Sequence, residues 1–242
     1  MRIPRLYYPH PIPLDCEFSL TDEAAHHVAT VLRLKANHPV VLFNGDGNEY
    51  SGQLISVSRK QVVVEADACL TLNKESPLPL HLGQGISKGD RMDTVLQKSV
   101  ELGVTEITPL ITERCAVKLD EKRWQKKHQQ WLKILISACE QSGRNRIPVL
   151  NEPLPLSQWF AASTKACRLV LAPGAESSLT QVPYCTHGYR LLIGPEGGLS
   201  DNEIHQAEEC GFSKTSLGPR ILRTETAAIA SLSLLQGLHG DL

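Results

Sequence analysis

The sequence predicts two parts of different fold class: a small antiparallel β-barrel over residues 1–72, followed by an α/β domain with a mainly parallel sheet over residues 73–242. Short runs rich in β-branched residues, separated by turn residues, fill the first part, whereas strand-like and helix-like segments alternate through the second. The 242 residues, of which 41% are hydrophobic and 21% charged, are ordinary for a globular protein of one or two domains.

One helix and three strands are expected in the first part. Thr21 is a suitable N-cap for a helix, because apolar residues follow it at helical spacing as far as Leu32. The sequence Asn-Gly-Asp-Gly-Asn at 44–48 is a strong turn signal between two runs of strand-forming residues. The strands are predicted at residues 40–43, 50–57 and 61–65, and residues 70–80 are interpreted as a linker.

Strand-like and helix-like segments alternate after the linker, a pattern typical of a parallel sheet with helices on its faces. Gly103 and Gly143 each follow a helical segment at the position where a glycine commonly ends a helix. Strands are predicted at residues 78–86, 104–112, 167–172, 190–193 and 215–217, and helices at residues 90–102, 121–142, 200–210 and 224–238.

Several classes of protein are disfavoured by the sequence. No apolar run approaches the roughly 18 residues of a membrane span, and residues 1–13 lack the apolar core of a signal peptide, so a cytoplasmic protein is expected. Seven cysteines are scattered without a C-x-x-C pair, which argues against a zinc ribbon and fits reduced thiols. The histidines lack metal-ligand spacing, so no metal is expected.

Charge is unevenly distributed along a chain whose formal net charge is −1. Residues 118–146 hold eight Lys or Arg residues against three Asp or Glu residues. A solvated helix face is favoured over a surface for nucleic acid as the explanation of such a segment, although the charge alone leaves both interpretations open.

Three predicted strands end in segments that suit a ligand site, because ligands of open parallel sheets lie beyond the carboxyl ends of the strands. The glycine-rich segment 194–198 carries Glu196 and precedes Ser200-x-x-Glu203, which has the pattern of a helix capping box. The segment 217–226 combines a Gly-Pro turn with two arginines and a Thr/Glu pair, and residues 171–173 offer backbone contacts. A tight turn and ordinary helix caps would also account for the first two segments.

A fourth segment has some features of a dinucleotide-binding loop. Residues 83–89 read G-x-G-x-x-x-G between a predicted strand and a predicted helix, and Glu113 follows the next strand, where a ribose-binding acid could lie. A nicotinamide-dependent dehydrogenase is therefore an alternative, although the spacing differs from the usual G-x-G-x-x-G.

These motifs resemble the ribosomal RNA small subunit methyltransferase E family of the SPOUT superfamily, and the resemblance spans nearly the whole chain. Its two most specific motifs are LIGPEGGLS at residues 192–200 and LGPRILRTETA at residues 217–227. The others are QKSVELGV at residues 97–104, ERC at 113–115, ACEQSGRNR at 138–146, RIPR at 2–5 and VLR at 31–33.

The resemblance implies a trefoil-knot methyltransferase domain over residues 73–242 and an N-terminal PUA-like β-barrel domain, an RNA-binding module, over residues 1–72. It also implies a homodimer, and S-adenosyl-L-methionine as the cofactor at the three strand exits. The cofactor-binding residues that it implies are Leu171, Ala172, Pro173, Gly194, Pro195, Gly197, Gly198, Leu217, Gly218, Leu222 and Thr224.

The reaction implied by the family is methyl transfer to N3 of one uridine in 16S ribosomal RNA, on the assembled small ribosomal subunit. N3 reacts once its proton has left, so the site needs a cation near the uridine anion and a group that accepts the proton. Arg223 is the candidate cation, Glu196 or Glu225 is the candidate proton acceptor, and no metal is needed. RNA contacts are expected from Arg2, Arg5, Arg33, Arg144, Arg146 and Arg220.

Two alternatives use the same scaffold. One is a knotted methyltransferase that acts on transfer RNA or on a ribose 2′-hydroxyl, and the other is an RNA-binding or assembly factor without catalysis. The barrel and the upstream motifs favour ribosomal RNA, and the intact glycine loops favour catalysis.

Overall fold

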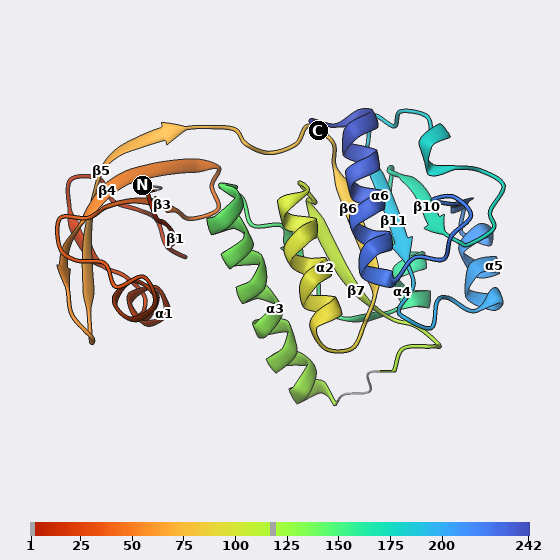
Figure 1. Ribbon diagram of the computed structural model, residues 1–242, viewed down its shortest axis with the longest axis horizontal. Coiled ribbons are helices and arrows are strands. Elements are labelled where there is room, and N and C mark those ends of the chain that lie inside the picture. The colour runs from red at the N-terminus through yellow and green to blue at the C-terminus, as the bar shows by residue number, and fades with distance from the viewer. Residues whose placement is uncertain (1–2, 117–119) are drawn as a thin grey trace. The chain divides into compact units, whose positions relative to one another are not determined.

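The computed structural model describes residues 3–116 and 120–242, and it divides into two compact units. The first unit combines Met1–Glu75 with Cys139–Ile147, and the second combines Ser76–Ala138 with Pro148–Leu242 (Figure 1). The predicted division at residues 72 and 73 does not include the return of the chain into the first unit at Cys139–Ile147. That each part is a separate domain stays a prediction.

The first unit is built on a five-stranded sheet with the order β1-β3-β4-β5-β2. The long strands β4 and β5 pair in antiparallel fashion, whereas β1 pairs with β3 in parallel, so the sheet is mixed rather than wholly antiparallel as predicted. β1 and β2 lie at opposite edges of the described sheet, which therefore forms an open half-barrel in its hydrogen bonding. The strands are β1 (Arg5–Tyr7), β2 (Glu17–Ser19), β3 (Pro39–Phe43), β4 (Asn48–Val57) and β5 (Val62–Thr71).

The predicted helix of this unit is present but changes its winding halfway. Thr21 accepts a hydrogen bond from the Ala24 N–H and so caps α1 (Asp22–His26), as predicted. The next turn, η1 (His27–Val31), is π-helical, and Arg33 after it has a positive φ of 53°. The unit's core is aliphatic, which is consistent with the low aromatic content; its members include Leu6, Val28, Leu42, Leu54 and Val64.

The second unit contains the predicted parallel sheet, with the strand order β12-β10-β11-β6-β7-β8. Each of these neighbouring pairs is parallel, and β9 adds a further parallel pairing to β7. The strands are β6 (Leu80–Gly85), β7 (Glu106–Ile111), β8 (Val149–Leu150), β9 (Leu154–Pro155), β10 (Cys167–Leu171), β11 (Tyr189–Ile193) and β12 (Ser213–Thr215). β12 begins two residues before the predicted strand. The strands β8 and β9 were not predicted, because two residues are too few to show the alternation of apolar and polar residues that marks a strand.

Two helices of this unit have an end at the residues that signal it. Gly103 has a φ of 77° just after α2, and Ser200 and Glu203 form the predicted capping box of α5. α2 and α6 lie side by side along the sheet (Figure 1). The helices are α2 (Asp90–Glu101), α3 (Glu121–Ser142), α4 (Leu156–Ala161), α5 (Asp201–Glu209) and α6 (Thr224–His239), with the 3₁₀ turn η2 (Leu179–Gln181). None of the described helices is long and apolar enough to cross a membrane.

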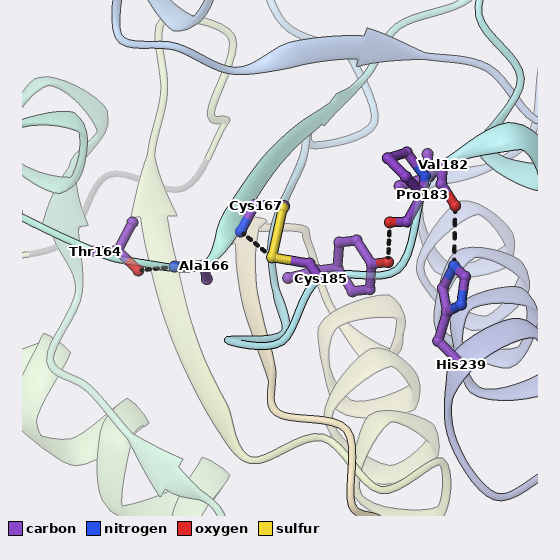
Figure 2. The surroundings of a disulfide bond; sticks show 8 residues. Thr164, Ala166, Cys167, Val182, Pro183, Cys185 and His239 are labelled. Atoms are coloured by element: carbon purple, nitrogen blue, oxygen red, sulfur yellow. Dashed lines mark hydrogen bonds between the residues drawn. A yellow bond between two sulfur atoms is a disulfide. The ribbon is translucent and has the colours of Figure 1, made fainter.

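The expectation that all cysteines are reduced is not met. Cys167 at the start of β10 forms a disulfide with Cys185, which precedes β11, and the other five cysteines are free (Figure 2). The chain returns from η2 to the start of β11, next to the start of β10, and this brings the two Cα atoms within 6.2 Å although they are 18 positions apart in the sequence. Their spacing in the sequence does not reveal this, because the pairing depends on the parallel register of β10 and β11.

Candidate functional site

The three strand exits chosen from the sequence lie around one cavity of about 440 Å³. β10 delivers residues 171–173, β11 delivers the glycine loop at 194–198, and the segment between β12 and α6 delivers residues 217–222. All eleven predicted cofactor-binding residues line this cavity, as do Glu196, Arg220, Arg223 and Glu225. The structure therefore brings together residues that are up to 54 positions apart (171 to 225), in a volume suited to a small molecule.

The glycine loop is held tightly against its surroundings. A Cβ on Gly194 would lie 2.8 Å from the backbone nitrogen of Leu199, so glycine is required at the start of the loop. Gly198 has a positive φ of 68°, and a Cβ there would meet no atom within 4 Å. The loop is thus tightly packed at Gly194, whereas a ligand can approach its backbone closely at Gly198.

Glu196 anchors this loop to the segment before α2. Its Oε1 accepts hydrogen bonds from the Lys88 backbone N–H and from the Arg91 guanidinium, each at 2.8 Å. Burial alone would raise the pKa of Glu196, but these bonds and the positive charge of Arg91 outweigh it and hold the pKa below its ordinary value. A carboxylate whose charged form is stabilised in this way is a weak base.

Arg91 and Arg114 line the cavity, although neither was selected from the sequence. Arg114 follows β7 and donates from Nη1 to the carbonyl oxygens of Gly197 and Leu199, at 3.0 and 3.3 Å. The ERC motif places Arg114 beyond the carboxyl end of a predicted strand, and this position was the available signal. Arg91 is the second residue of α2, where the sequence gives no comparable signal.

The segment before α6 contributes the remaining charged groups. Arg220 and Arg223 are exposed and form no ion pair within the described chain, and Ile221 between them is 85% exposed. Glu225 is different, because its Oε2 is buried and has no hydrogen-bond partner among the described residues. A buried carboxylate oxygen without a donor is available to accept a proton or to face a positively charged ligand.

Two of the predicted RNA-binding arginines are engaged inside the first unit instead. Arg5 forms an ion pair with Glu49 and donates to Asn145 Oδ1 at 2.6 Å, and its side chain is 8% exposed. Arg144 pairs with Glu75, to which its Nε donates at 3.0 Å, and its side chain is 6% exposed. Because both guanidinium groups are buried and paired with carboxylates, this placement argues against direct phosphate contacts. An arginine count along the sequence cannot distinguish such internal partners from solvent.

The other predicted RNA-binding arginines have different surroundings. Arg33 and Arg146 are exposed in the first unit, and Arg220 is exposed at the cavity. Arg2 lies outside the described residues. The RNA contacts of all these arginines stay predictions.

Residues 83–89, the possible dinucleotide-binding segment, do not form a glycine loop around a ligand. Gly83 and Gly85 belong to β6, where a Cβ on Gly83 would lie 2.5 Å from the Trp159 ring and one on Gly85 would lie 2.5 Å from Pro195. These glycines are therefore required by close packing rather than by a bound pyrophosphate. Across the described part of the chain, no His, Cys, Asp and Glu side chains form a metal-binding group of three or more.

Comparisons with known proteins agree with this geometry. The family model described as "RNA methyltransferase domain" matches residues 74–236, and that described as "RNA methyltransferase PUA domain" matches residues 20–67. The chain is 38% identical to a protein named ribosomal RNA small subunit methyltransferase E from Buchnera aphidicola, with 100% of this chain and 98% of that protein covered. A protein of the same name from Bacillus subtilis is 34% identical, with 93% of each chain covered.

Two solved structures match over the full length of both chains. The methyltransferase Lpg2936 from Legionella pneumophila, in complex with the cofactor SAM, is 47% identical with a TM-score of 0.94. The ribosomal RNA small subunit methyltransferase E from Neisseria gonorrhoeae, bound to S-adenosyl methionine, is 38% identical with a TM-score of 0.93. These matches exclude the dehydrogenase alternative, and the chain belongs to the ribosomal RNA small subunit methyltransferase E family.

Proposed function

We propose that this protein transfers a methyl group from S-adenosylmethionine to N3 of one uridine in the 16S ribosomal RNA of the small ribosomal subunit. The observation that carries the proposal is the single cavity at the carboxyl ends of β10 and β11, where the residues of both C-terminal motifs converge. A trefoil knot, a homodimer, a cytoplasmic location and recognition of the assembled subunit are finer parts of the same proposal.

The residues around the cavity fit S-adenosylmethionine. Leu171, Ile193 and Leu222 offer apolar walls for a purine ring, and the left-handed Gly198 and Gly218 leave the backbone open to contact. The buried Oε2 of Glu225 needs a donor or a positive charge from a bound molecule, since no described residue supplies one. When bound, this cofactor supplies an electrophilic methyl group and positive charge on sulfur.

The protein's own groups would act on the uridine. Arg223 lies at the cavity mouth without a carboxylate partner in the described chain, so its guanidinium is available to stabilise negative charge on O2 or O4. Glu225 is a better candidate for the N3 proton than Glu196, because the Glu196 carboxylate already accepts two hydrogen bonds and the Glu225 Oε2 accepts none. The target base must leave its stack to reach these groups.

A methyl-transfer assay with labelled S-adenosylmethionine tests the proposal. The substrates are small ribosomal subunits that lack the modification, free 16S RNA and transfer RNA, with a sample without enzyme as the control. We expect label in N3-methyluridine, and label only with the subunit would show that assembly is required. Label in transfer RNA or on a ribose 2′-hydroxyl would support the alternative methyltransferase. Cofactor binding without transfer to any substrate would support an RNA-binding factor.

A further inference from the structure

Gln84 is a polar side chain that lies outside the two C-terminal motifs and is absent from the cavity lining. It is the fifth residue of β6, and its relative exposure is 0%. The strand is in register with β11, where Gln84 pairs with Ile193, the residue before the glycine loop. The amide of Gln84 therefore lies beneath the cavity rather than in its wall.

The side chain of Gln84 connects two walls of the cavity. Its Nε2 donates to Thr224 Oγ1 at 2.9 Å and to the Gly85 carbonyl at 3.0 Å, and lies 3.4 Å from the Gly194 carbonyl. The Thr224 hydroxyl in turn donates to the Gly194 carbonyl at 2.7 Å. The Thr224 hydroxyl thus joins the first residue of α6 to the glycine loop, and one amide hydrogen of Gln84 joins it to β6, while the other amide hydrogen goes to Gly85 of the same strand.

These bonds hold the first residue of α6, a helix that lacks a side-chain cap. The N-cap of α6 is Arg223, whose side chain makes no capping hydrogen bond. Thr224 follows it directly and is the residue that the network holds, with Glu225 next along the chain. The places of Arg223 and Glu225 therefore depend on the contact between Thr224 and Gln84.

Stability alone does not account for a glutamine here. Its Oε1 is buried and has no hydrogen-bond partner within the described residues. A buried amide oxygen without a donor is destabilising and offsets part of what the Nε2 bonds contribute, so an apolar side chain of the same size would lose those bonds but also remove this penalty. The donor function of Nε2 is what such a replacement would remove.

We propose that Gln84 is a positioning residue: it holds the first turn of α6 to the glycine loop and so fixes Arg223 and Glu225 in the cavity. The inference rests on the proposed function for its catalytic consequence. Its structural half, the anchoring of α6, does not depend on that function.

The first measurement is hydrogen exchange in the protein without ligands. Gln84→Met keeps the length of the side chain and removes the donors. In that variant the Ala227 amide, which donates to the Arg223 carbonyl, should exchange about 10-fold faster, while the Gly240 amide at the other end of α6 keeps its rate. Ser231→Ala is the matched control, because Ser231 is equally buried in α6 and its hydroxyl also lacks a partner in the described residues.

The second measurement separates turnover from cofactor binding. Gln84→Met should lower kcat by about 10- to 100-fold, as expected for a small displacement of catalytic groups, and change the cofactor Kd by much less. Gln84→Glu can donate from the side chain only when it is protonated, so its kcat relative to wild type should rise as the pH falls. The same ratio for Gln84→Met should stay level.

The outcomes separate the two proposals. Unchanged exchange at Ala227 together with unchanged kcat would overturn the role of Gln84, and so would an equal loss of kcat in Ser231→Ala. A wild-type protein that binds the cofactor but methylates no RNA would overturn the proposed function alone, and the exchange rates would then decide on Gln84.

Discussion

Single side chains at the cavity differ in their chemistry because their partners differ. Glu196 and Glu225 are both glutamates of the two specific motifs, yet the first is held by Lys88 and Arg91 and the second has a carboxylate oxygen without a partner in the described chain. A sequence motif places both near the site, but it cannot show which carboxylate already accepts hydrogen bonds from other residues. We therefore propose that Glu196 holds the glycine loop in place and that Glu225 accepts the N3 proton.

Glu225→Gln tests this difference directly. The amide keeps the shape of the side chain but does not accept the N3 proton, so we expect kcat to fall by about 100-fold. The deficit should shrink at alkaline pH, where solvent removes the proton instead. Glu196→Gln is the matched variant and should mainly weaken cofactor binding, because it loosens the glycine loop. Equal effects of the two substitutions on kcat would contradict the assignment.

Arg223→Ala should reduce turnover more than cofactor affinity. Removal of one group that stabilises developing negative charge costs about 100-fold or more in kcat. Single-turnover methyl transfer and calorimetric titration with S-adenosylmethionine measure the two quantities separately. Arg220→Ala in the same segment serves as the control and should raise the KM for RNA. If Arg223→Ala mainly weakened the cofactor, its proposed role would be wrong.

The strands also carry a buried titratable group near their amino ends, away from the cavity. His81 in β6 contacts Thr108 Oγ1 through Nε2 at 2.8 Å, and its ring packs edge-on against Trp159. Burial, together with a smaller effect of the nearby Arg190, lowers the pKa of His81 to about 4, although Glu106 opposes the shift. The folded protein thus holds His81 neutral at pH values where the unfolded chain binds a proton.

This predicts a loss of stability in acid. A depressed histidine pKa makes its full contribution above the unfolded pKa of about 6.5 and loses it as the pH falls toward the folded value. The free energy of unfolding should fall by about 2 kcal/mol between pH 7.5 and pH 5 on account of His81 alone. Denaturant unfolding of wild type and His81→Gln measures this, and an equal pH dependence in both proteins would contradict it.

The disulfide between Cys167 and Cys185 links the start of β10 to the segment before β11 (Figure 2). Closing a loop across 18 residues should stabilise the fold by about 3 kcal/mol through the unfolded chain. Unfolding with and without a thiol reductant checks this value. Cys167→Ser is the control, because its stability should not respond to the reductant. A wild-type protein whose unfolding midpoint ignores the reductant would show that the bond contributes nothing.

Local sequence signals predicted the elements of the second unit well, for identifiable reasons. Helix α2 and α5 carry their own end signals in Gly103 and in the Ser200–Glu203 capping box, so their limits follow from nearby residues. The disulfide and the parallel pairing of β1 with β3 depend on contacts between distant segments, which no local pattern encodes. No local pattern marks Gln84 either, since its partner Thr224 lies 140 positions away in the sequence.

At the scale of the whole molecule, the two units do not follow the predicted division at residues 72 and 73. The end of α3 belongs to the first unit, where Asn145 donates to the Leu72 carbonyl and accepts from Arg5. Glu140 accepts a hydrogen bond from the Tyr7 N–H at 3.0 Å in the same unit. The first unit is therefore assembled from two stretches of chain that are far apart in sequence.

A fragment of residues 1–75 should consequently fail to fold cooperatively. It would lose the hydrogen bonds from Arg5 to Asn145 and from the Tyr7 N–H to Glu140, and each such bond contributes about 0.5–1.5 kcal/mol to stability. Circular dichroism during urea unfolding provides the measurement. Joining residues 136–148 to this fragment through a flexible linker should restore a cooperative transition. A cooperative transition in residues 1–75 alone would show that the second stretch is dispensable.

The network of Gln84, Thr224 and Gly194 also sets an order of events during synthesis. Translation produces β6 long before α6, and the hydrogen bond between Gln84 and Thr224 spans 140 positions of the chain. A nascent chain that has not yet released α6 therefore has an incomplete cavity, however well its sheet has formed. The ability to bind a ligand is acquired only as the polypeptide leaves the ribosome that made it.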